Sequence, residues 1–306
     1  MIYAMTLNPA IDYVVKTENF LVGELNRLYQ EEMYFGGKGI NVSRVLKEFG
    51  LDSVNLGYIA GFTGDAIKEG IEGRGLETDF VKLKNGNSRI NVKVKSGSET
   101  ELNGKGPKIR RKDKEELFNK LSRLKKGDIL VMSGSIPAGL SDTIYEEIMA
   151  SIKQKGVEFV VDASGNLLKN ALKHNPLLIK PNKLELEQLF GQKVDTASET
   201  IACAKKLIEK GALNVLVSMG KDGAVFVNRE NEAYKITAPK GEAINTVGAG
   251  DSTVAGFLAG YINGESVENI LKIAIASGSA TAFSEDLATK EEIDEIIEKV
   301  KVEKVN

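Results

Sequence analysis

The sequence predicts an α/β fold in which a mainly parallel sheet is buried between helices, with a small second sheet beside it. Short apolar segments of strand length alternate with longer helical patterns, which is the order of βαβ units. Their almost uniform hydrophobicity suits strands that are covered on both faces. Because no Pro-, Gly- or Ser-rich linker divides the 306 residues, we expect one domain over residues 1–306. The apolar segments are Ile129–Met132, Glu158–Val161, Leu177–Ile179 and Val215–Val217.

Helical patterns occupy the segments between these strands and the end of the chain. Asp142–Lys155 precedes the second strand, and Lys183–Phe190 with Ser198–Lys210 precede the last. The tail Lys290–Val305 is predicted as one charged amphipathic helix, and its Glu/Lys pairs indicate a face in contact with solvent.

Two segments mix polar and apolar residues and predict a different kind of sheet. Ile11–Phe35 and Arg89–Leu102 have strand-like composition, and Asn91–Lys95 alternates as a strand with one wet face does. We expect the segments of about 11–35 and 89–105 to form an accessory sheet over the ends of the main strands. Such a sheet can act as a lid that closes on a substrate and excludes water. A plain extension of the main sheet is the alternative.

Composition narrows the partners and the location. The 41 Lys and Arg residues and 43 Asp and Glu residues give a net charge of -2, so neither nucleic acid nor a membrane surface is an expected partner. No apolar run approaches the roughly 20 residues that span a bilayer, and the N-terminus does not read as a signal peptide. We therefore expect a cytoplasmic protein. Cys203, the single cysteine, is predicted to be buried, and His174, the single histidine, to lie in a surface loop.

The strongest local signal for chemistry is the segment Asn245–Ser252. Gly248, Ala249 and Gly250 leave the backbone bare just before a helical run, so amide groups can converge on an anion at the positive end of the helix. Asp251 follows this turn directly. It is a candidate to accept the proton of an attacking hydroxyl in phosphoryl transfer, a reaction that depends mainly on positioning and charge stabilisation. A simple helix N-cap is the alternative for Asp251.

A second glycine turn, Gly36–Asn41, lies between strand-like Gln30–Phe35 and a helix predicted over Val42–Phe49. Its glycines permit a ligand to approach the backbone closely. Lys38 offers a positive charge to a phosphate, and Asn41 can bind sugar hydroxyls from the first helical turn. A tight βα turn with a surface lysine is the alternative.

Two further turns are weaker signals. Ser218–Gly223 follows an apolar strand and by itself predicts a hairpin turn. In Lys180–Glu185, Asn182 and Glu185 have the spacing of a helix capping box. Absent motifs exclude other classes: the chain has no P-loop, no Gly-x-Gly-x-x-Gly after its first strand and no His-Arg-Asp loop. These absences argue against P-loop NTPases, dinucleotide oxidoreductases and protein kinases.

Taken together, Gly36–Asn41 and Asn245–Asp251 resemble the paired signatures of the ribokinase-like (PfkB-type) carbohydrate kinases. Thr6–Asp12 and Ser133–Pro137 resemble the branch that contains 1-phosphofructokinase and tagatose-6-phosphate kinase. The resemblance covers essentially the whole chain. It implies a three-layer α/β/α sandwich with a mainly parallel central sheet and a small β-sheet lid, ATP as donor and Mg²⁺ as cofactor.

The resemblance also implies roles for individual residues. Asp251 matches the catalytic base, and Gly248, Ala249 and Gly250 match the anion hole. Glu185 matches a position that organises Mg²⁺ through water. The acceptor sugar is matched to Asp12, Gly37, Asn41 and Asn103, and its existing phosphate to Arg27, Lys38 and Arg89. The positions matched to the nucleotide are Asn182, Ser218, Gly220, Gly223, Gly248, Gly250 and, in the segment Ala274–Ala280 that would flank the adenine, Ser277.

The substrate remains open between two ketohexose phosphates. Asn8–Asp12 and Gly248–Asp251 favour fructose 1-phosphate, and tagatose 6-phosphate is the alternative, since the two sugars differ at one stereocentre and each carries one free primary hydroxyl. Asn245 departs from the aspartate that is frequent in the family, so a charged role there is not expected. A sugar-phosphate sensor without turnover is a further alternative. Pairing of two lids would give a homodimer.

Overall fold

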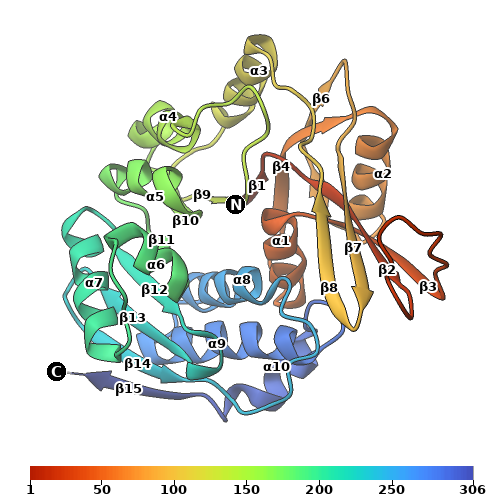
Figure 1. The fold of residues 1–306 in the computed structure, drawn as a ribbon. Coiled ribbons are helices and arrows are strands. Elements are labelled where there is room, and N and C mark those ends of the chain that lie inside the picture. The colour runs from red at the N-terminus through yellow and green to blue at the C-terminus, as the bar shows by residue number, and fades with distance from the viewer. Residues whose placement is uncertain (306) are drawn as a thin grey trace.

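The chain folds around two β-sheets, which the computed structural model describes over residues 1–305 (Figure 1). The larger sheet has eleven strands. These are β1 (Ile2–Thr6), β4 (Ser53–Ala60), β5 (Glu77–Thr78), β6 (Val81–Leu83), β9 (Ile129–Ser133), β10 (Glu158–Asp162), β11 (Leu178–Ile179), β12 (Asn214–Ser218), β13 (Ala224–Asn228), β14 (Ala233–Thr237) and β15 (Lys301–Val305).

The order of the larger sheet is β15-β14-β13-β12-β11-β10-β9-β1-β4-β5, with β6 pairing β4. The strands from β12 through β5 run parallel, whereas β13, β14 and β15 are antiparallel. The predicted mainly parallel sheet is therefore confirmed, with an antiparallel edge of which only the first hairpin, at Ser218–Gly223, was predicted.

Ten helices cover the larger sheet within residues 1–305, five on each face. Successive side chains along a buried strand point to opposite faces of the sheet, and both faces are apolar. Leu130 and Met132 join one apolar cluster, and Ile129 and Val131 join the other. The first face carries α3 (Arg111–Leu121), α4 (Ile144–Ile152), α5 (Gly165–Ala171), α6 (Lys183–Phe190) and α7 (Ala197–Glu209). The second carries α1 (Lys38–Glu48), α2 (Gly61–Glu72), α8 (Ala249–Ile262), α9 (Val267–Phe283) and α10 (Lys290–Ile297) (Figure 1).

Helix α8 is the central helix of the second face, because all its residues from 251 to 260 are buried. It packs closely on α9 through small residues. A Cβ added to Gly256 would lie 2.5 Å from Ser277 Oγ, and one added to Gly278 would overlap Thr253. The α8–α9 contact therefore depends on glycine, and it sets the position of the first turn of α8 at the edge of the sheet.

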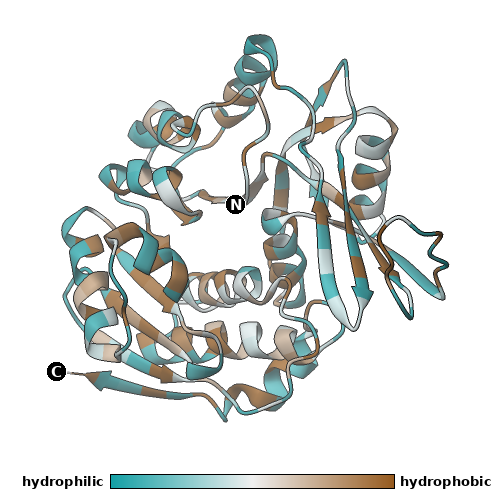
Figure 2. Ribbon diagram, in the orientation of Figure 1, coloured by the Kyte–Doolittle hydropathy of each residue, from teal (hydrophilic) through white to brown (hydrophobic). Residues whose placement is uncertain are grey.

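The smaller sheet has four strands in the order β3-β2-β7-β8. It pairs β2 (Ala10–Lys16) antiparallel to β3 (Gln30–Gly36) and parallel to β7 (Arg89–Ser96), and β7 antiparallel to β8 (Ser98–Asn103). Hydrophilic and hydrophobic residues are interspersed along these strands (Figure 2). The smaller sheet predicted from this alternation is thus present.

Three local predictions need correction. The tail is not one helix: α10 ends at Ile297, and Lys301–Val305 pairs antiparallel with β14. Charged residues are compatible with an edge strand as well as with a helix, because one side of an edge strand faces water. Helix α1 begins at Lys38 rather than at Val42, so the second glycine turn is itself the helix start. His174 is half-buried at the end of a short 3₁₀ turn.

Cys203 is buried, as predicted. No helix within residues 1–305 has the length and apolar character needed to cross a membrane.

Candidate active site

The site lies where the parallel strands end. Thr6 of β1, Ser133 of β9 and Asp162 of β10 stand in register as the last residues of adjacent strands. The carboxyl ends of parallel strands are the usual place for ligands in such sheets. The first turns of α1 and α8 arrive at the same edge, so the two predicted glycine motifs, which are more than 200 residues apart, meet there.

The turn before α8 exposes backbone amides. Gly248 has φ 84°, a left-handed conformation, and a Cβ there would overlap the side chain of Leu287, so glycine is required on both counts. The first helical hydrogen bond runs from Ser252 N to Gly248 O (2.8 Å). The amides of Gly250 and Asp251 precede it and are available to an anion. Asp251 is the third residue of α8, and Gly248 occupies the N-cap position.

Asp251 is only 5% exposed, and its carboxylate accepts a hydrogen bond from Asn41 Nδ2 (2.8 Å). Burial is the largest influence and, with the nearby carboxylate of Asp162, raises the pKa of Asp251 to about 7. Lys38, the hydrogen bond from Asn41 and Lys180 act in the opposite direction. A carboxyl with a pKa near neutrality is suited to accept and release a proton.

A second carboxylate, Asp162, joins two lysines beside Asp251. Lys38 Nζ lies 3.2 Å from Asp162 Oδ2, and Lys180 Nζ lies 3.3 Å from Asp162 Oδ1. Burial opposes ionisation of Asp162, but the two ammonium groups outweigh it and lower its pKa. Burial likewise opposes the charge of Lys38, yet Asp162 and then Asp251 raise the pKa of Lys38. Asp162 and Lys38 are therefore charged near neutral pH.

This cluster contains Lys38, which was predicted to bind the phosphate of the sugar, and adds residues that sequence reasoning missed. Lys38 pairs with Asp162 and lies near Asp251. Asp162 and Lys180 had no predicted role. The available signal was that each is the first charged residue after a buried strand core, a position that many structural residues share.

The glycines at the start of α1 serve packing. A Cβ on Gly37, which has φ 145°, would lie 2.5 Å from Thr6 Cγ2, and one on Gly39 would lie 2.7 Å from Thr6 Oγ1. Thr6 Oγ1 accepts a hydrogen bond from Ile40 N (3.3 Å). Glycine thus lets α1 press onto the end of β1, which brings Asn41 within reach of Asp251.

The smaller sheet supplies a polar network on the other side of Asn41. A Cβ on Gly36 would lie 3.7 Å from both Asp12 Oδ2 and Asn41 Oδ1, so these side chains flank one glycine. Asp12 Oδ1 accepts from Asn91 Nδ2 (2.8 Å), and Asn91 Oδ1 accepts from Gly104 N (3.2 Å). Asn91, which is buried, was not predicted as a site residue.

The remaining acceptor-side residues lie at differing distances from this network. Arg89 Nε donates to Asn8 O (3.0 Å); burial lowers the pKa of Arg89, and the charge of Asp12 opposes that effect. Asn103 is exposed, stands opposite Asn91 in the sheet and donates to Glu101 (3.2 Å). Arg27 is exposed in the loop between β2 and β3.

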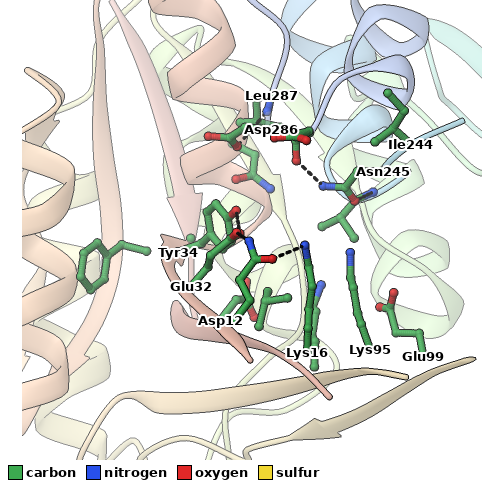
Figure 3. Close-up of a pocket in the computed structure, with 18 of the residues that line it drawn as sticks. Asp12, Lys16, Glu32, Tyr34, Lys95, Glu99, Ile244, Asn245, Asp286 and Leu287 are labelled. Carbon is green, nitrogen blue, oxygen red and sulfur yellow. Dashed lines mark hydrogen bonds between the residues drawn. The ribbon is translucent and has the colours of Figure 1, made fainter. Parts of the chain in front are cut away.

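A cleft of about 420 Å³ separates the smaller sheet from the start of α1 and two loops of the main domain (Figure 3). Lys16 and Lys95 extend from the smaller sheet into it. Lys16, Lys93 and Lys95 line it without having been predicted, whereas Arg27, Lys38 and Arg89 do not. The full lining is Asp12, Val14, Lys16, Gln30, Glu32, Tyr34, Phe35, Gly36, Asn41, Arg44, Lys93, Lys95, Glu99, Ile244, Asn245, Val247, Glu285, Asp286 and Leu287.

An ion pair holds the cleft wall together. Arg44 of α1 makes two hydrogen bonds, of 3.0 and 2.6 Å, to the carboxylate of Asp286. Asn245, the departure noted in the sequence, donates to Glu285 O (2.9 Å). These contacts tie the loop before α8 and the loop after α9 to each other and to α1.

The predicted nucleotide positions gather at the ends of β11 and β12. Asn182 and Glu185 form the predicted capping box: Asn182 Oδ1 accepts from Glu185 N (2.8 Å), and Glu185 Oε2 accepts from Asn182 N (2.9 Å). Asn182 and Ser218 pair as an isolated parallel bridge. Gly220 and Gly223, with φ 59° and 88°, shape the turn between β12 and β13, so the predicted hairpin is confirmed.

Ser277 differs from the prediction. It is fully buried between α9 and α8, and its hydroxyl donates to Ile273 O (2.8 Å). Its side chain has no surface for a nucleotide, because the close α8–α9 contact covers it. The periodic small residues of Ala274–Ala280 reflect that helix contact.

The donor set bears on a divalent cation. Within residues 1–305, no three Asp, Glu, His or Cys side chains converge as a cage for a metal ion. Mg²⁺ is commonly held by one or two carboxylates together with phosphates and water. The half-buried carboxylate of Glu185 fits that mode and would not hold the ion alone.

Comparison with known proteins agrees with this geometry. Residues 3–294 match the model of the pfkB family carbohydrate kinases. The chain is 46% identical to 1-phosphofructokinase of Bacillus subtilis, over 99% of each chain. It is 36% identical to tagatose-6-phosphate kinase of Staphylococcus epidermidis, again over 99% of each. The crystal structure of a putative phosphofructokinase from Staphylococcus aureus superposes with a TM-score of 0.90 at 41% identity, covering 100% of this chain and 99% of that one. With both glycine motifs meeting at one buried carboxylate, this chain belongs to the pfkB family of carbohydrate kinases.

Proposed function

We propose that the chain transfers the terminal phosphoryl group of ATP to the free primary hydroxyl of fructose 1-phosphate, giving fructose 1,6-bisphosphate and ADP. The observation that carries the proposal is the buried Asp251, whose pKa is raised to about 7 beside the bare amides of Gly250 and Asp251. Such a group accepts a hydroxyl proton, while the amides hold negative charge on the migrating group.

In the reaction, the acceptor oxygen forms a bond to the terminal phosphorus as the bond from that phosphorus to the bridging oxygen of ADP breaks. The hydroxyl proton passes to Asp251, and ADP leaves with the electron pair of the broken bond. Asn41 orients the carboxylate through its 2.8 Å hydrogen bond. Positioning of this kind carries most of the catalysis in phosphoryl transfer.

The acceptor sugar is proposed to lie in the cleft between the smaller sheet and α1. Asp12, held by Asn91, accepts hydrogen bonds from sugar hydroxyls, with Gly37, Asn41 and Asn103 around it. Lys93 stands one cleft-facing row further from Asp251 than Asp12 does, because Asp12 pairs with Asn91 and Val14 pairs with Lys93. That row is about 7 Å away along the strand, so Lys93 suits the phosphate at the far end of the sugar.

Two predicted phosphate-binding residues keep a place in the proposal. Arg89 is next to Asp12 and is partly desolvated, so it adds positive charge at the rim of the sugar site. Arg27 is exposed on its own chain, and contact with the substrate requires movement of its loop or a second copy.

On the donor side, we propose that the phosphates of ATP meet the turn of Gly248, Ala249 and Gly250, chiefly through the amides of Gly250 and Asp251. The nucleotide is proposed to lie over Asn182, Ser218, Gly220 and Gly223. Mg²⁺ bound to these phosphates supplies charge neutralisation. Glu185 would hold the ion, in part through water. The reaction belongs in the cytoplasm, where ATP and phosphorylated sugars are available.

The smaller sheet is proposed to act as a lid and to pair with the lid of a second copy. Its face away from the cleft carries one row of apolar residues across all four strands, Met33, Tyr13, Val92 and Leu102. Met33 is 61% and Leu102 is 59% exposed. The loop between β2 and β3 adds exposed Leu21, Val22 and Leu25. An apolar patch of this extent is typical of an interface.

The test is a comparison of kcat/KM for four acceptors: the 1-phosphates and the 6-phosphates of fructose and of tagatose. ADP release is followed by a coupled assay. This set separates the position of the phosphate from the stereochemistry of the sugar. We expect fructose 1-phosphate to give the highest value, in keeping with the 46% identity to 1-phosphofructokinase against 36% to tagatose-6-phosphate kinase.

Preference for tagatose 6-phosphate would overturn the substrate assignment and leave the kinase assignment intact. Binding of all four sugar phosphates without ADP release would identify a sensor and overturn the proposed function.

A further inference from the structure

Asp162 shares its two carboxylate oxygens between two lysines from distant parts of the chain. Lys38 begins α1, and Lys180 directly follows β11, yet their ammonium groups lie 3.2 and 3.3 Å from Asp162. Asp162 is 2% and Lys180 is 6% exposed, whereas the side chain of Lys38 is 44% exposed. Burying Lys180 is costly unless a partner compensates for its lost hydration.

The cluster has one positive charge more than its central carboxylate balances. Two lysines and one aspartate leave a surplus that Asp251, with its pKa of about 7, offsets only in part. An anion is therefore electrostatically favoured next to it. A purely structural ion pair would not need a second ammonium group on the same carboxylate.

Geometry directs this surplus to the anion-binding turn. A Cβ added to Gly250 would lie 2.9 Å from Lys180 Nζ, so this ammonium group is directly beside the first turn of α8. Lys38 approaches from α1. The same helix carries Asn41, whose side chain donates a hydrogen bond to Asp251. The two ammonium groups thus bracket the place where the amides of Gly250 and Asp251 meet the acceptor side.

We infer that Lys180 contacts the migrating phosphoryl group directly, and that Asp162 is a positioning residue that holds Lys180 and Lys38 on two sides of that group. The inference rests on the proposed phosphoryl transfer and deepens it. Negative charge spreads over the equatorial oxygens of the phosphoryl group as the new phosphorus–oxygen bond forms and the bond to ADP breaks. Two preorganised ammonium groups stabilise that charge without reorganising.

The central experiment is a mutant cycle built on near-isosteric changes: Asp162→Asn, Lys38→Met, Lys180→Met, the double lysine variant and the triple variant. Asp162→Asn and Lys180→Met are each expected to lower kcat about 10²–10³-fold, the loss typical for one preorganised charge-stabilising group. KM for the sugar phosphate should stay within about twofold, because neither residue contacts the non-reacting part of the sugar.

Non-additivity distinguishes positioning from independent action. If Asp162 acts through the lysines, Asp162→Asn costs almost nothing further in kcat once both lysines are methionine. An equal loss from Asp162→Asn in the wild-type and double-lysine backgrounds would overturn the positioning role, as would an unchanged kcat in Asp162→Asn. An unchanged kcat in Lys180→Met would overturn the contact with the phosphoryl group.

A binding measurement is independent of turnover. Lys180→Met is expected to weaken ATP more than ADP in titration calorimetry without sugar, since only ATP carries the group that Lys180 contacts. Equal weakening of the two nucleotides would contradict that contact. This measurement also carries the test if Asp162→Asn does not fold.

Asp128→Asn is the matched control for burial. Asp128 is 2% exposed and paired with the N-terminal amine, but it lies just before β9, at the opposite end of the sheet. It is expected to lower the melting temperature and keep kcat. Failure of the proposed function appears differently, because the wild-type protein would then release no ADP with any of the four sugar phosphates.

Discussion

Asn41→Ala tests how the proton affinity of Asp251 is set. Burial and Asp162 raise the pKa of Asp251 to about 7, whereas Lys38, the hydrogen bond from Asn41 and Lys180 lower it. Asn41 Nδ2 donates to Asp251 Oδ2 over 2.8 Å, and such a bond is stronger to a carboxylate than to a neutral carboxyl. Removal of the amide is therefore expected to raise the pKa further.

The magnitude follows from the strength of that bond. A hydrogen bond to a charged group contributes about 1.5–3 kcal/mol, and the protonated carboxyl still accepts a weaker one. A difference of about 1.4 kcal/mol between the two protonation states corresponds to about one pKa unit. At about pH 7 the ionised fraction of Asp251 would fall from about one half to about one tenth. We expect the loss in kcat/KM to be about fivefold larger at that pH than near pH 9, where only the loss of sugar contact and orientation remains.

The assay is kcat/KM for the sugar phosphate across this pH range, at constant ionic strength, because this ratio reports the free enzyme. Asn166→Ala is the matched control: Asn166 Nδ2 also donates to an aspartate, Asp142 Oδ2 (2.9 Å), but on the exposed surface of α5. The Asn166→Ala variant should not change the pH at which kcat/KM falls on the acidic side of the profile. A loss in Asn41→Ala that is equal at every pH, or an acidic limb that does not move, would refute the reasoning.

Three further changes test the base, the turn and the lid. Asp251→Asn is expected to lower kcat about 10²–10⁴-fold. Because the pKa of Asp251 is raised in the folded protein, the variant's gain in melting temperature over the wild-type protein should grow as pH rises from about 4 to about 7. An equal gain at every pH would contradict the raised pKa. Gly250→Ala should fold normally, since alanine favours a helix. It should lower kcat, because its new Cβ would lie 2.9 Å from Lys180 Nζ and displace this ammonium group; wild-type kcat would show that the ammonium position is unimportant. Met33→Glu with Leu102→Glu should convert a dimer to a monomer in light scattering, whereas Leu184→Glu, equally exposed but on α6, should not, and a monomeric wild-type protein would exclude the lid interface.

Patterns with a local physical cause were predictable from the sequence. The buried strands follow from unbroken apolar runs, and the smaller sheet from alternation in segments such as Asn91–Lys95. The turns at Gly37 and Gly248 follow from glycine itself, because a side chain would overlap Thr6 at the first position and Leu287 at the second. The capping box at Asn182 depends on three-residue spacing alone.

Features that depend on tertiary partners were not predictable. The tail pairs with β14 because an edge strand was available, a fact that its own composition does not record. The sequence motif around Ser277 matches a nucleotide-binding position of the family, but in the fold α8 covers this side chain. Lys93 faces the cleft through its register with Val14, and register is invisible until the strands are paired. For Lys180, only the fold reveals which carboxylate lies 3.3 Å away.

The two lysines beside the buried Asp251 explain why the site needs Asp162. An isolated buried carboxylate would hold its proton too tightly, and two unpaired lysines beside it would hold it too loosely and resist folding. Asp162 acts on both sides, since its charge raises the pKa of Asp251 and of Lys38, and its two oxygens hold both ammonium groups in place. Each of these charges is tolerable only with the others present. One carboxylate at the end of β10 therefore contributes both to the proton affinity of the base and to the position of the positive charge that faces the phosphoryl group.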